Sequence, residues 1–321
     1  MKILDLDHLP KALDPQLGTL SVLNGDPPQD RAFIRRLRSM GFPAAEYYAV
    51  YAVEDHEIQS RVEVIRPPFT TRAGTRAVTG ISDVSTRPDR IRRGLARSLL
   101  EEVHRRESAR GQRWCLLWTH RSWGAHRLYE ALGYRDIYSP PSAMRSIPRS
   151  APRPMPKGYR WTAGHRRDLG RMDRLFDRAS KGRVGLVPRV PRTLATRCRL
   201  GWRVPENHRI LALGRATVGY AHLATSLWHV GANEVVVASP EHAPAMLDAL
   251  EQMARGRWLT LGTTTFVRDF DPMLRSRGYA VSPTAHLTLM AKPLTRERAP
   301  PDDPALACRD PRFSCHRADV F

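Results

Sequence analysis

The residues with the clearest chemical potential lie in one short turn, where glycine, alanine and arginine meet the expected start of a helix. Residues 92–98 read RRGLARS. Gly94 and Ala96 leave room for a ligand beside the backbone, and the amides of a first helical turn have no partner within the helix. Those amides attract anions, and Arg92, Arg93 and Arg97 add positive charge on the same rim. The turn therefore predicts a diphosphate-binding site.

A strand before the turn and a helix after it must position these groups. The apolar patterning predicts a strand over 75–86, a polar turn over 87–93 and a helix over 95–110. The apolar run RWCLLWT at 113–119 predicts a buried strand, and a helix over 124–132 should end at Gly133. This order predicts a mixed α/β layer with a strand, turn and helix at its centre.

Two segments of this region resemble the GNAT family of acyl-CoA N-acyltransferases. The sequence IRRGLA at 91–96 resembles the pyrophosphate motif Gln/Arg-x-x-Gly-x-Gly/Ala, and AHRLYEALGY at 125–134 resembles the family's Ala-x-x-Leu-Tyr-x-x-x-Gly-Phe/Tyr helix. The chain departs from the family at Ile91, where Gln or Arg is usual, and at Ser122, where Asn is common. The resemblance is strong over residues 75–138 and rests elsewhere on the order of elements.

The resemblance implies an acetyl-CoA-dependent N-acetyltransferase, in which a primary amine attacks the thioester directly in a ternary complex. Pantetheine would pair with the strand backbone, and Tyr129 would protonate the leaving thiolate. The residues expected to bind acetyl-CoA, as acyl-donor substrate, are Val84, Ser85, Thr86, Arg92, Arg93, Gly94, Leu95, Ala96, Arg97, Ser98 and Ser122.

The general base is less defined by the sequence. Ser82 and Asp83 are neighbours on the motif strand and must point to opposite faces, so at most one of them faces the substrate. Asp83 is the residue we expect to be catalytic together with Tyr129. Weaker candidates are Glu54, Glu57 and His120, and a chain of water molecules is a further alternative.

The second half of the chain repeats the order of elements without the chemistry. Its counterpart of the turn, SPEHAP at 239–244, has neither glycine nor arginine, and Leu274 takes the place of Tyr129. We therefore expect two tandem GNAT-like mixed-sheet domains flanked by helices, an α/β fold, with the active site in the first. The expected boundaries are a catalytic domain at 1–140, a Pro-rich linker at 141–158, a degenerate copy at 159–293 and a surface tail at 294–321.

Composition leaves one functional alternative open. The net charge of +20 suits a polyanionic partner, but the cations are mostly arginines scattered along the chain. A non-catalytic module that binds acyl-CoA or nucleic acid is therefore the alternative. Cys308, Cys315 and His316 match no standard zinc spacing, so we expect no metal site. Few cysteines and the lack of a long apolar run predict a cytoplasmic protein without a membrane partner. The acceptor amine and the oligomeric state are not predicted.

Overall fold

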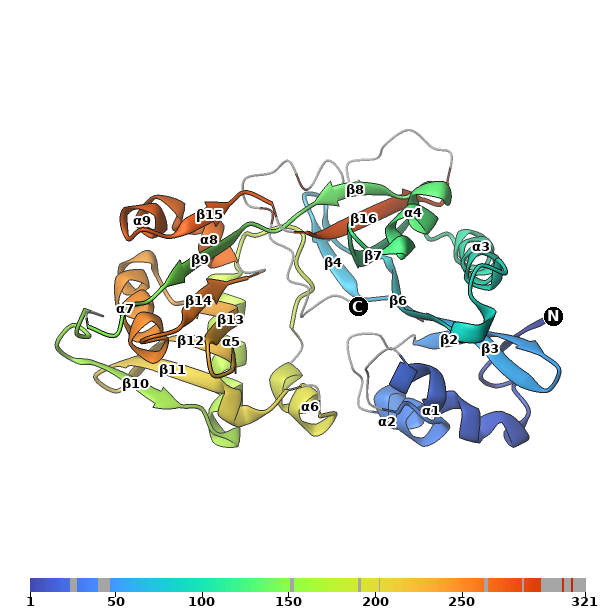
Figure 1. The fold of residues 1–321 in the computed structure, drawn as a ribbon, viewed down its shortest axis with the longest axis horizontal. Coiled ribbons are helices and arrows are strands. Elements are labelled where there is room, and N and C mark those ends of the chain that lie inside the picture. The colour runs from blue at the N-terminus through green and yellow to red at the C-terminus, as the bar shows by residue number, and fades with distance from the viewer. Residues whose placement is uncertain are drawn as a thin grey trace. The chain divides into compact units, whose positions relative to one another are not determined.

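The chain forms two compact units in a computed structural model. The structure describes residues 1–23, 28–39, 47–150, 153–189, 192–201, 203–262, 265–284, 286–295, 308 and 313. The first unit is built from Met1–Tyr138 and Leu287–Phe313, and the second is built from Ser139–His286. Each unit has one large mixed sheet with helices beside it, so the expected α/β class is confirmed (Figure 1).

The first unit contains a seven-stranded sheet. In spatial order its strands are β1 (Lys2–Asp5), β2 (Tyr48–Glu54), β3 (Glu57–Ile65), β6 (Thr79–Thr86), β7 (Trp114–His120), β16 (Leu287–Pro293) and β8 (Arg135–Tyr138). Only β6 and β7 pair in parallel, and all other neighbours are antiparallel. The strands β4 (Pro68–Thr71) and β5 (Gly74–Ala77) form a separate two-stranded sheet.

Helices cover both faces of this first sheet. Helices α1 (Asp14–Leu23) and α2 (Arg31–Ser39) bury Leu17, Leu20 and Ile34 against one face of β2 and β3. Helices α3 (Leu95–Ala109) and α4 (Gly124–Ala131) pack on the other face. Successive side chains of a strand point to opposite faces, so β2 and β3 supply both cores. Short 3-10 turns at Lys11–Leu13 and Pro88–Arg90 precede α1 and α3.

The second unit repeats this sheet order. Its strands, in space, are β10 (Tyr159–Ala163), β11 (His208–Leu213), β12 (Ala216–Thr225), β13 (His229–Val237), β14 (Trp258–Leu261), β9 (Ser142–Ser146) and β15 (Ala280–Ser282). Its helices are α5 (Leu169–Ala179), α6 (Thr193–Arg199), α7 (Ala243–Met253), α8 (Thr265–Asp269) and α9 (Asp271–Ser276). Short 3-10 turns lie at Arg166–Asp168, Pro205–Asn207 and Pro240–His242. The only parallel pair of this sheet is β13 with β14, as β6 with β7 in the first.

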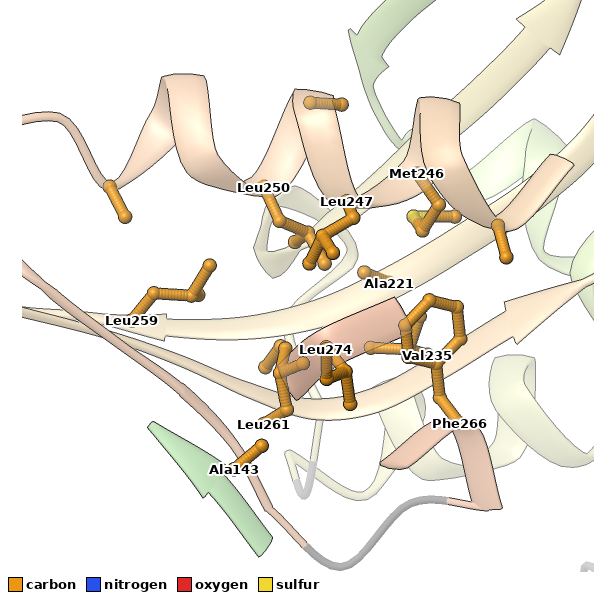
Figure 2. Packing of buried hydrophobic residues seen from close by; sticks show 14 of the residues in the cluster. Ala143, Ala221, Val235, Met246, Leu247, Leu250, Leu259, Leu261, Phe266 and Leu274 are labelled. Carbon is orange, nitrogen blue, oxygen red and sulfur yellow. The ribbon is translucent and has the colours of Figure 1, made fainter. Parts of the chain in front are cut away.

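Helix α7 contributes the centre of the second core. Figure 2 shows Met246, Leu247 and Leu250 of α7 directed at the sheet, where they meet Ala221, Val235 and Leu259. All six side chains are buried. Burial of aliphatic groups at about 25 cal/mol per Å² is the main stabilising contribution here.

Matching hydrogen bonds show that the units are two copies of one fold. The amide of Tyr134 donates to the carbonyl of Tyr129 at 3.0 Å, and the amide of Tyr279 donates to the carbonyl of Leu274 at the same distance. Both bonds follow a short helix and lead into the last strand of that copy. The predicted duplication is therefore present in the structure.

The two copies exchange one strand each, which differs from the expected boundaries. Strand β9, at 142–146, lies between β14 and β15 of the second sheet, so the segment expected as a linker at 141–158 contains a sheet strand. Pro140, Pro141 and Pro148 flank this strand without interrupting it. Strand β16, at 287–293, lies between β7 and β8 of the first sheet. The last residues of the expected second domain at 159–293 therefore belong to the first unit.

Two further expectations differ in detail. The strand expected over 75–86 is divided between β5 and β6, because the amide of Val78 donates to the carbonyl of Pro67 at 3.2 Å and redirects the chain. Most of the expected surface tail at 294–321 lies outside the described residues. Within it, Phe313 is buried and its ring lies 4.9 Å from that of Tyr138.

Candidate functional site

Strands β6 and β7 separate partway along their length. Their parallel ladder ends at the pair Ile81–Leu117, while β6 continues to Thr86 and β7 to His120. A register shift opposite Arg61 and Glu63, and a φ of +37° at Asp83, show a bulge in β6 just beyond that point. Beyond the ladder, β6 has an edge to which an extended ligand can add as a strand.

The directions of the backbone N–H and C=O groups show which residues of β6 form this free edge. The carbonyl of Ser85 accepts a hydrogen bond from Ser60 Oγ at 2.7 Å, and the amide of Arg87 donates to the backbone carbonyl of Gln59 at 2.9 Å. Both groups therefore face β3. Because backbone groups alternate in direction along a strand, those of Val84 and Thr86 face the side of β7. These are the two residues that the sequence predicts as pantetheine partners.

The turn after β6 presents the first amides of α3. Arg92 and Gly94 both have left-handed backbone conformations, with φ of +64° and +78°. Gly94 is the N-cap of the 15-residue α3, which has no side-chain cap and no acidic residue in its first turn. The amide of Ser98 donates to the Gly94 carbonyl at 3.0 Å. The amides before Ser98 at the exposed end of the helix are those that an anion would bind.

Exposed arginines surround these amides. Arg92, Arg93 and Arg97 are all exposed. Arg93 lies 3.6 Å from a carboxylate oxygen of Glu54, and Arg97 lies 3.8 Å from one of Glu101. Surface ion pairs of this length contribute little energy, so a phosphate group competes readily for these side chains. Leu95 is buried and anchors the start of the helix in the core, while Ala96 beside it is half-buried.

Tyr129 lies on α4, in the core on the same face of the sheet as α3. Its side chain is buried, and its ring lies 5.8 Å from that of Tyr134 in an edge arrangement. Burial raises the pKa of Tyr129 to about 12. The hydroxyl therefore keeps its proton at neutral pH, as a proton donor must.

Asp83 is held in a buried ion pair that sequence reasoning missed. Its carboxylate pairs with the fully buried guanidinium of Arg61 and accepts a hydrogen bond from Ser85 Oγ at 2.5 Å. Glu63 lies 3.3 Å from the same guanidinium. The sequence signal for this ion pair was the presence of two charged residues, Arg61 and Glu63, within the largely buried strand at 57–65. The catalytic role of Asp83 stays a prediction, and Ser82 is its neighbour in β6.

The remaining candidates lie at the ends of strands. Glu57 pairs with Arg87 at 2.7 Å, and Glu54 lies beside Arg93 as described above. Nδ1 of His120 lies 2.7 Å from Ser122 Oγ, and the His120 ring stacks on the exposed ring of Trp123. Ser122 therefore contacts the end of β7, on the far side of the separation from β6.

The corresponding positions of the second unit carry different groups. Leu274 is completely buried in the second core, as Figure 2 shows. The turn before α7 is a 3-10 turn that contains the exposed Glu241. Within the described part of the chain, no group of three metal-ligating side chains comes together in either unit, and no helix is both long and apolar enough to cross a membrane.

Comparison with known proteins agrees with this geometry. Residues 71–140 match the family described as FR47-like protein, and no match was found among curated proteins. Similar solved structures include a probable N-acyltransferase from Enterococcus faecalis V583, with a TM-score of 0.63 and 13% identity, covering 91% of this chain and 72% of that one. A GCN5-related N-acetyltransferase from Anabaena variabilis ATCC 29413 has a TM-score of 0.64 and 11% identity, covering 92% and 73%.

A third structure also contains two copies of the fold. It is a tandem GNAT protein from the clavulanic acid biosynthesis pathway, with a TM-score of 0.55 and 15% identity, covering 92% of this chain and 99% of that one. At such identities the likeness concerns the fold. With its two matching sheets and its FR47-like segment, the chain is a tandem protein of the GNAT fold.

Proposed function

We propose that the protein is an acetyl-CoA-dependent N-acetyltransferase with its active site in the first unit. The observation that carries this proposal is the separation of β6 from β7 next to a turn whose helical amides have no side-chain cap. Pantetheine pairs with Val84 and Thr86, and the diphosphate binds the amides between Gly94 and Ser98. Arg92, Arg93 and Arg97 surround the phosphates.

The reaction is a direct transfer. The lone pair of an unprotonated primary amine attacks the thioester carbonyl, a tetrahedral intermediate forms, and its collapse breaks the carbon–sulfur bond. The thiolate takes the hydroxyl proton of Tyr129, which is protonated at neutral pH, and water then returns a proton to the phenolate. The surplus proton of the amine passes to water, or to Asp83 if its pair with Arg61 opens.

The engaged carboxylate of Asp83 favours one alternative, a non-catalytic module that binds acyl-CoA. Both functions require acyl-CoA to bind the first unit, and only the enzyme releases CoA. For either function we propose that the second unit does not bind acyl-CoA. Its turn contains the acidic Glu241, and Leu274 stands where the first unit has Tyr129.

A two-part experiment tests the proposal. Acetyl-CoA is added to the full chain while the unfolding temperature is measured, and a library of primary amines is then screened for CoA thiol release. We expect stabilisation by acetyl-CoA and thiol release with at least one amine. Stabilisation without release from any amine identifies the binding module. If neither acetyl-CoA nor a longer acyl-CoA changes the unfolding temperature, both functions are wrong.

A further inference from the structure

The turn between β12 and β13 carries large apolar side chains. The amide of Ser226 donates to the carbonyl of His229 at 2.8 Å, so Leu227 and Trp228 are the two central residues of a tight turn. Polar residues, glycine and proline are usual in such turns. Leu227 and Trp228 instead have exposed fractions of 84% and 72%, the highest values for large apolar side chains among the described residues. This turn therefore presents to water two groups that water disfavours.

The start of β14 brings a second tryptophan to the same place. The amide of Trp258 donates to the carbonyl of Trp228 at 2.9 Å, and the parallel ladder of β13 and β14 begins at the pair His229–Trp258. The Trp258 side chain is 49% exposed. Exposed apolar side chains that stand alone are common, whereas a group of them marks an interaction surface. We call Leu227, Trp228 and Trp258 the apolar tip.

Arginines lie around the apolar tip. Nη1 of Arg257 donates to the carbonyl of Ser226 at 3.2 Å, so this guanidinium lies beside the turn. Arg255 is exposed two residues earlier in the chain. The side chain of Arg149 crosses over Gly256, where an added Cβ would lie 2.9 Å from its Cγ. None of these three arginines forms an ion pair with a described residue, so their charges are available to a partner.

Acidic residues are missing from the segments that form this surface. The segments are residues 142–150, 225–230 and 253–260, and they contain neither Asp nor Glu. Glu251, just before the third segment, is buried, and its carboxylate oxygens lie 3.4 Å from guanidinium nitrogens of Arg145 and Arg277. Its charge is therefore compensated within the second unit. The apolar tip is surrounded by positive charge, which attracts an anionic partner.

The charge and the shape of this surface distinguish between partners. A second copy that met the same surface across a two-fold axis would bring arginines against arginines, which is unfavourable. Nucleic-acid bases would stack on the two indoles and leave Leu227 without a role. An anionic lipid surface uses every group, because leucine enters the acyl boundary, tryptophan prefers the headgroup level and arginine pairs with phosphate.

We propose that the apolar tip binds the surface of a membrane that contains anionic lipids. Leu227 and Trp228 insert between the headgroups, Trp258 lies at the headgroup level, and the surrounding arginines pair with lipid phosphates. This attachment needs no membrane-spanning helix, and it departs from the sequence prediction of a protein without a membrane partner. It is independent of acyl-CoA binding in the first unit.

Vesicle binding by the full chain tests the proposal. The protein is mixed with vesicles of phosphatidylcholine, alone or with phosphatidylglycerol, and the bound fraction is measured by sedimentation at low and high salt. We expect the affinity for the mixed vesicles to be at least about tenfold higher than for the neutral ones, and to fall as salt is added. Equal affinity for both kinds of vesicle, or no binding to either, would overturn the proposal.

A first pair of variants tests the apolar contribution. The double variant Leu227→Ser, Trp228→Ser should weaken binding to the mixed vesicles at least about tenfold, because two apolar groups no longer insert. Both residues are exposed, so folding should be retained, and the unfolding temperature checks this. Leu213→Ser is the matched control, since Leu213 is an exposed leucine at the end of the β11–β12 hairpin of the same unit, and it should bind as wild type. Equal losses in both variants would contradict a site at the apolar tip.

A second pair tests the charge. Arg149→Gln with Arg255→Gln should remove most of the preference for phosphatidylglycerol. Arg174→Gln with Arg178→Gln removes the same charge from the exposed side of α5 and should leave the preference unchanged. Two other outcomes would replace the membrane by another partner and overturn the proposal. One is a dimer in light scattering that Trp228→Ser separates, without vesicle binding. The other is binding of oligothymidylate with quenching of tryptophan fluorescence, again without vesicle binding.

Discussion

The two units share a sheet order and differ at the turn between the central strand and the helix. In the first unit Gly94 takes a φ of +78° and α3 starts without a cap or an acidic residue. In the second unit the 3-10 turn at Pro240–His242 contains an exposed glutamate, which repels phosphate. Both copies have a cluster of buried apolar side chains. The fold therefore tolerates different residues at this turn, because few residues form the turn and, of those at the start of α3, only Leu95 fills the core.

The last helix shows the same division between fold and chemistry. The carbonyls of Tyr129 and Leu274 accept equivalent hydrogen bonds at 3.0 Å. Any side chain permits this backbone contact, and both side chains pack in their cores. Only the tyrosine has a proton to donate. The comparison leads to four predictions.

The largest effect is expected from the exchanged strands. Met290→Asp places a charge in a fully buried position of β16 and should destabilise the first unit by about 4 kcal/mol. Ala143→Asp, in β9, should instead destabilise the second unit. Hydrogen exchange measured by mass spectrometry reports each unit separately. If Met290→Asp loosens residues 153–284 and leaves residues 47–138 protected, the strand assignment is wrong.

The second effect concerns the turn. Gly94→Val forces a β-branched residue into a left-handed conformation and should weaken acetyl-CoA binding about 100-fold, or about 3 kcal/mol. Gly278→Val introduces the same strain in the second unit, where Gly278 has a φ of +80°. That variant should lose stability and keep its affinity for acetyl-CoA in calorimetric titration. Equal loss of affinity in both variants would contradict a site confined to the first unit.

The third effect concerns proton donation. Tyr129→Phe should lower kcat about 10- to 100-fold and leave the Kd for acetyl-CoA nearly unchanged, because in the proposed mechanism the hydroxyl acts on the leaving thiolate and not on binding. Leu274→Met in the second unit should change neither quantity. Steady-state kinetics with the best amine of the library measures both. An unchanged kcat in Tyr129→Phe would show that the thiolate leaves without this donor.

The smallest effect is a dependence of stability on pH. Lys292 Nζ donates to Nδ1 of His104, so the other ring nitrogen donates to the Tyr134 hydroxyl at 2.8 Å. Burial, followed by the charge of Lys292, lowers the pKa of His104 to about 3. The unfolded chain, with a pKa near 6.5, therefore binds more protons between these values, and stability falls as the pH drops below about 6.5.

His104→Gln should reduce this slope by about 1 kcal/mol per pH unit between about pH 6 and pH 4. Urea unfolding at a series of pH values gives the slopes. A slope that is equal in wild type and His104→Gln would show that His104 is not held neutral by its site.

Local patterns predicted most of the elements that surround the candidate site. The helix expected over 95–110 is α3 at Leu95–Ala109, and the helix expected over 124–132 is α4 at Gly124–Ala131. These segments have strong apolar periodicity and end at glycines, so neighbouring residues are enough to define them. The resemblance to the GNAT fold rested on the same segments and is confirmed.

Contacts between distant residues were not predictable in the same way. Nothing near Leu287 indicates that its strand lies against β7, since pairing depends on which edge is open in the folded sheet. The partner of Asp83 was missed because Arg61 is far away along the chain.

The sequence by itself determined the turn, the helix with Tyr129 and the different residue types at the corresponding positions of the second copy. It did so because short-range periodicity, glycine conformation and side-chain identity are local properties. Only the tertiary structure decided that β6 and β7 separate beyond Ile81, that each sheet is completed by a strand from elsewhere in the chain, and that Asp83 is paired with Arg61. These outcomes depend on which distant groups are brought together when water is excluded from the core.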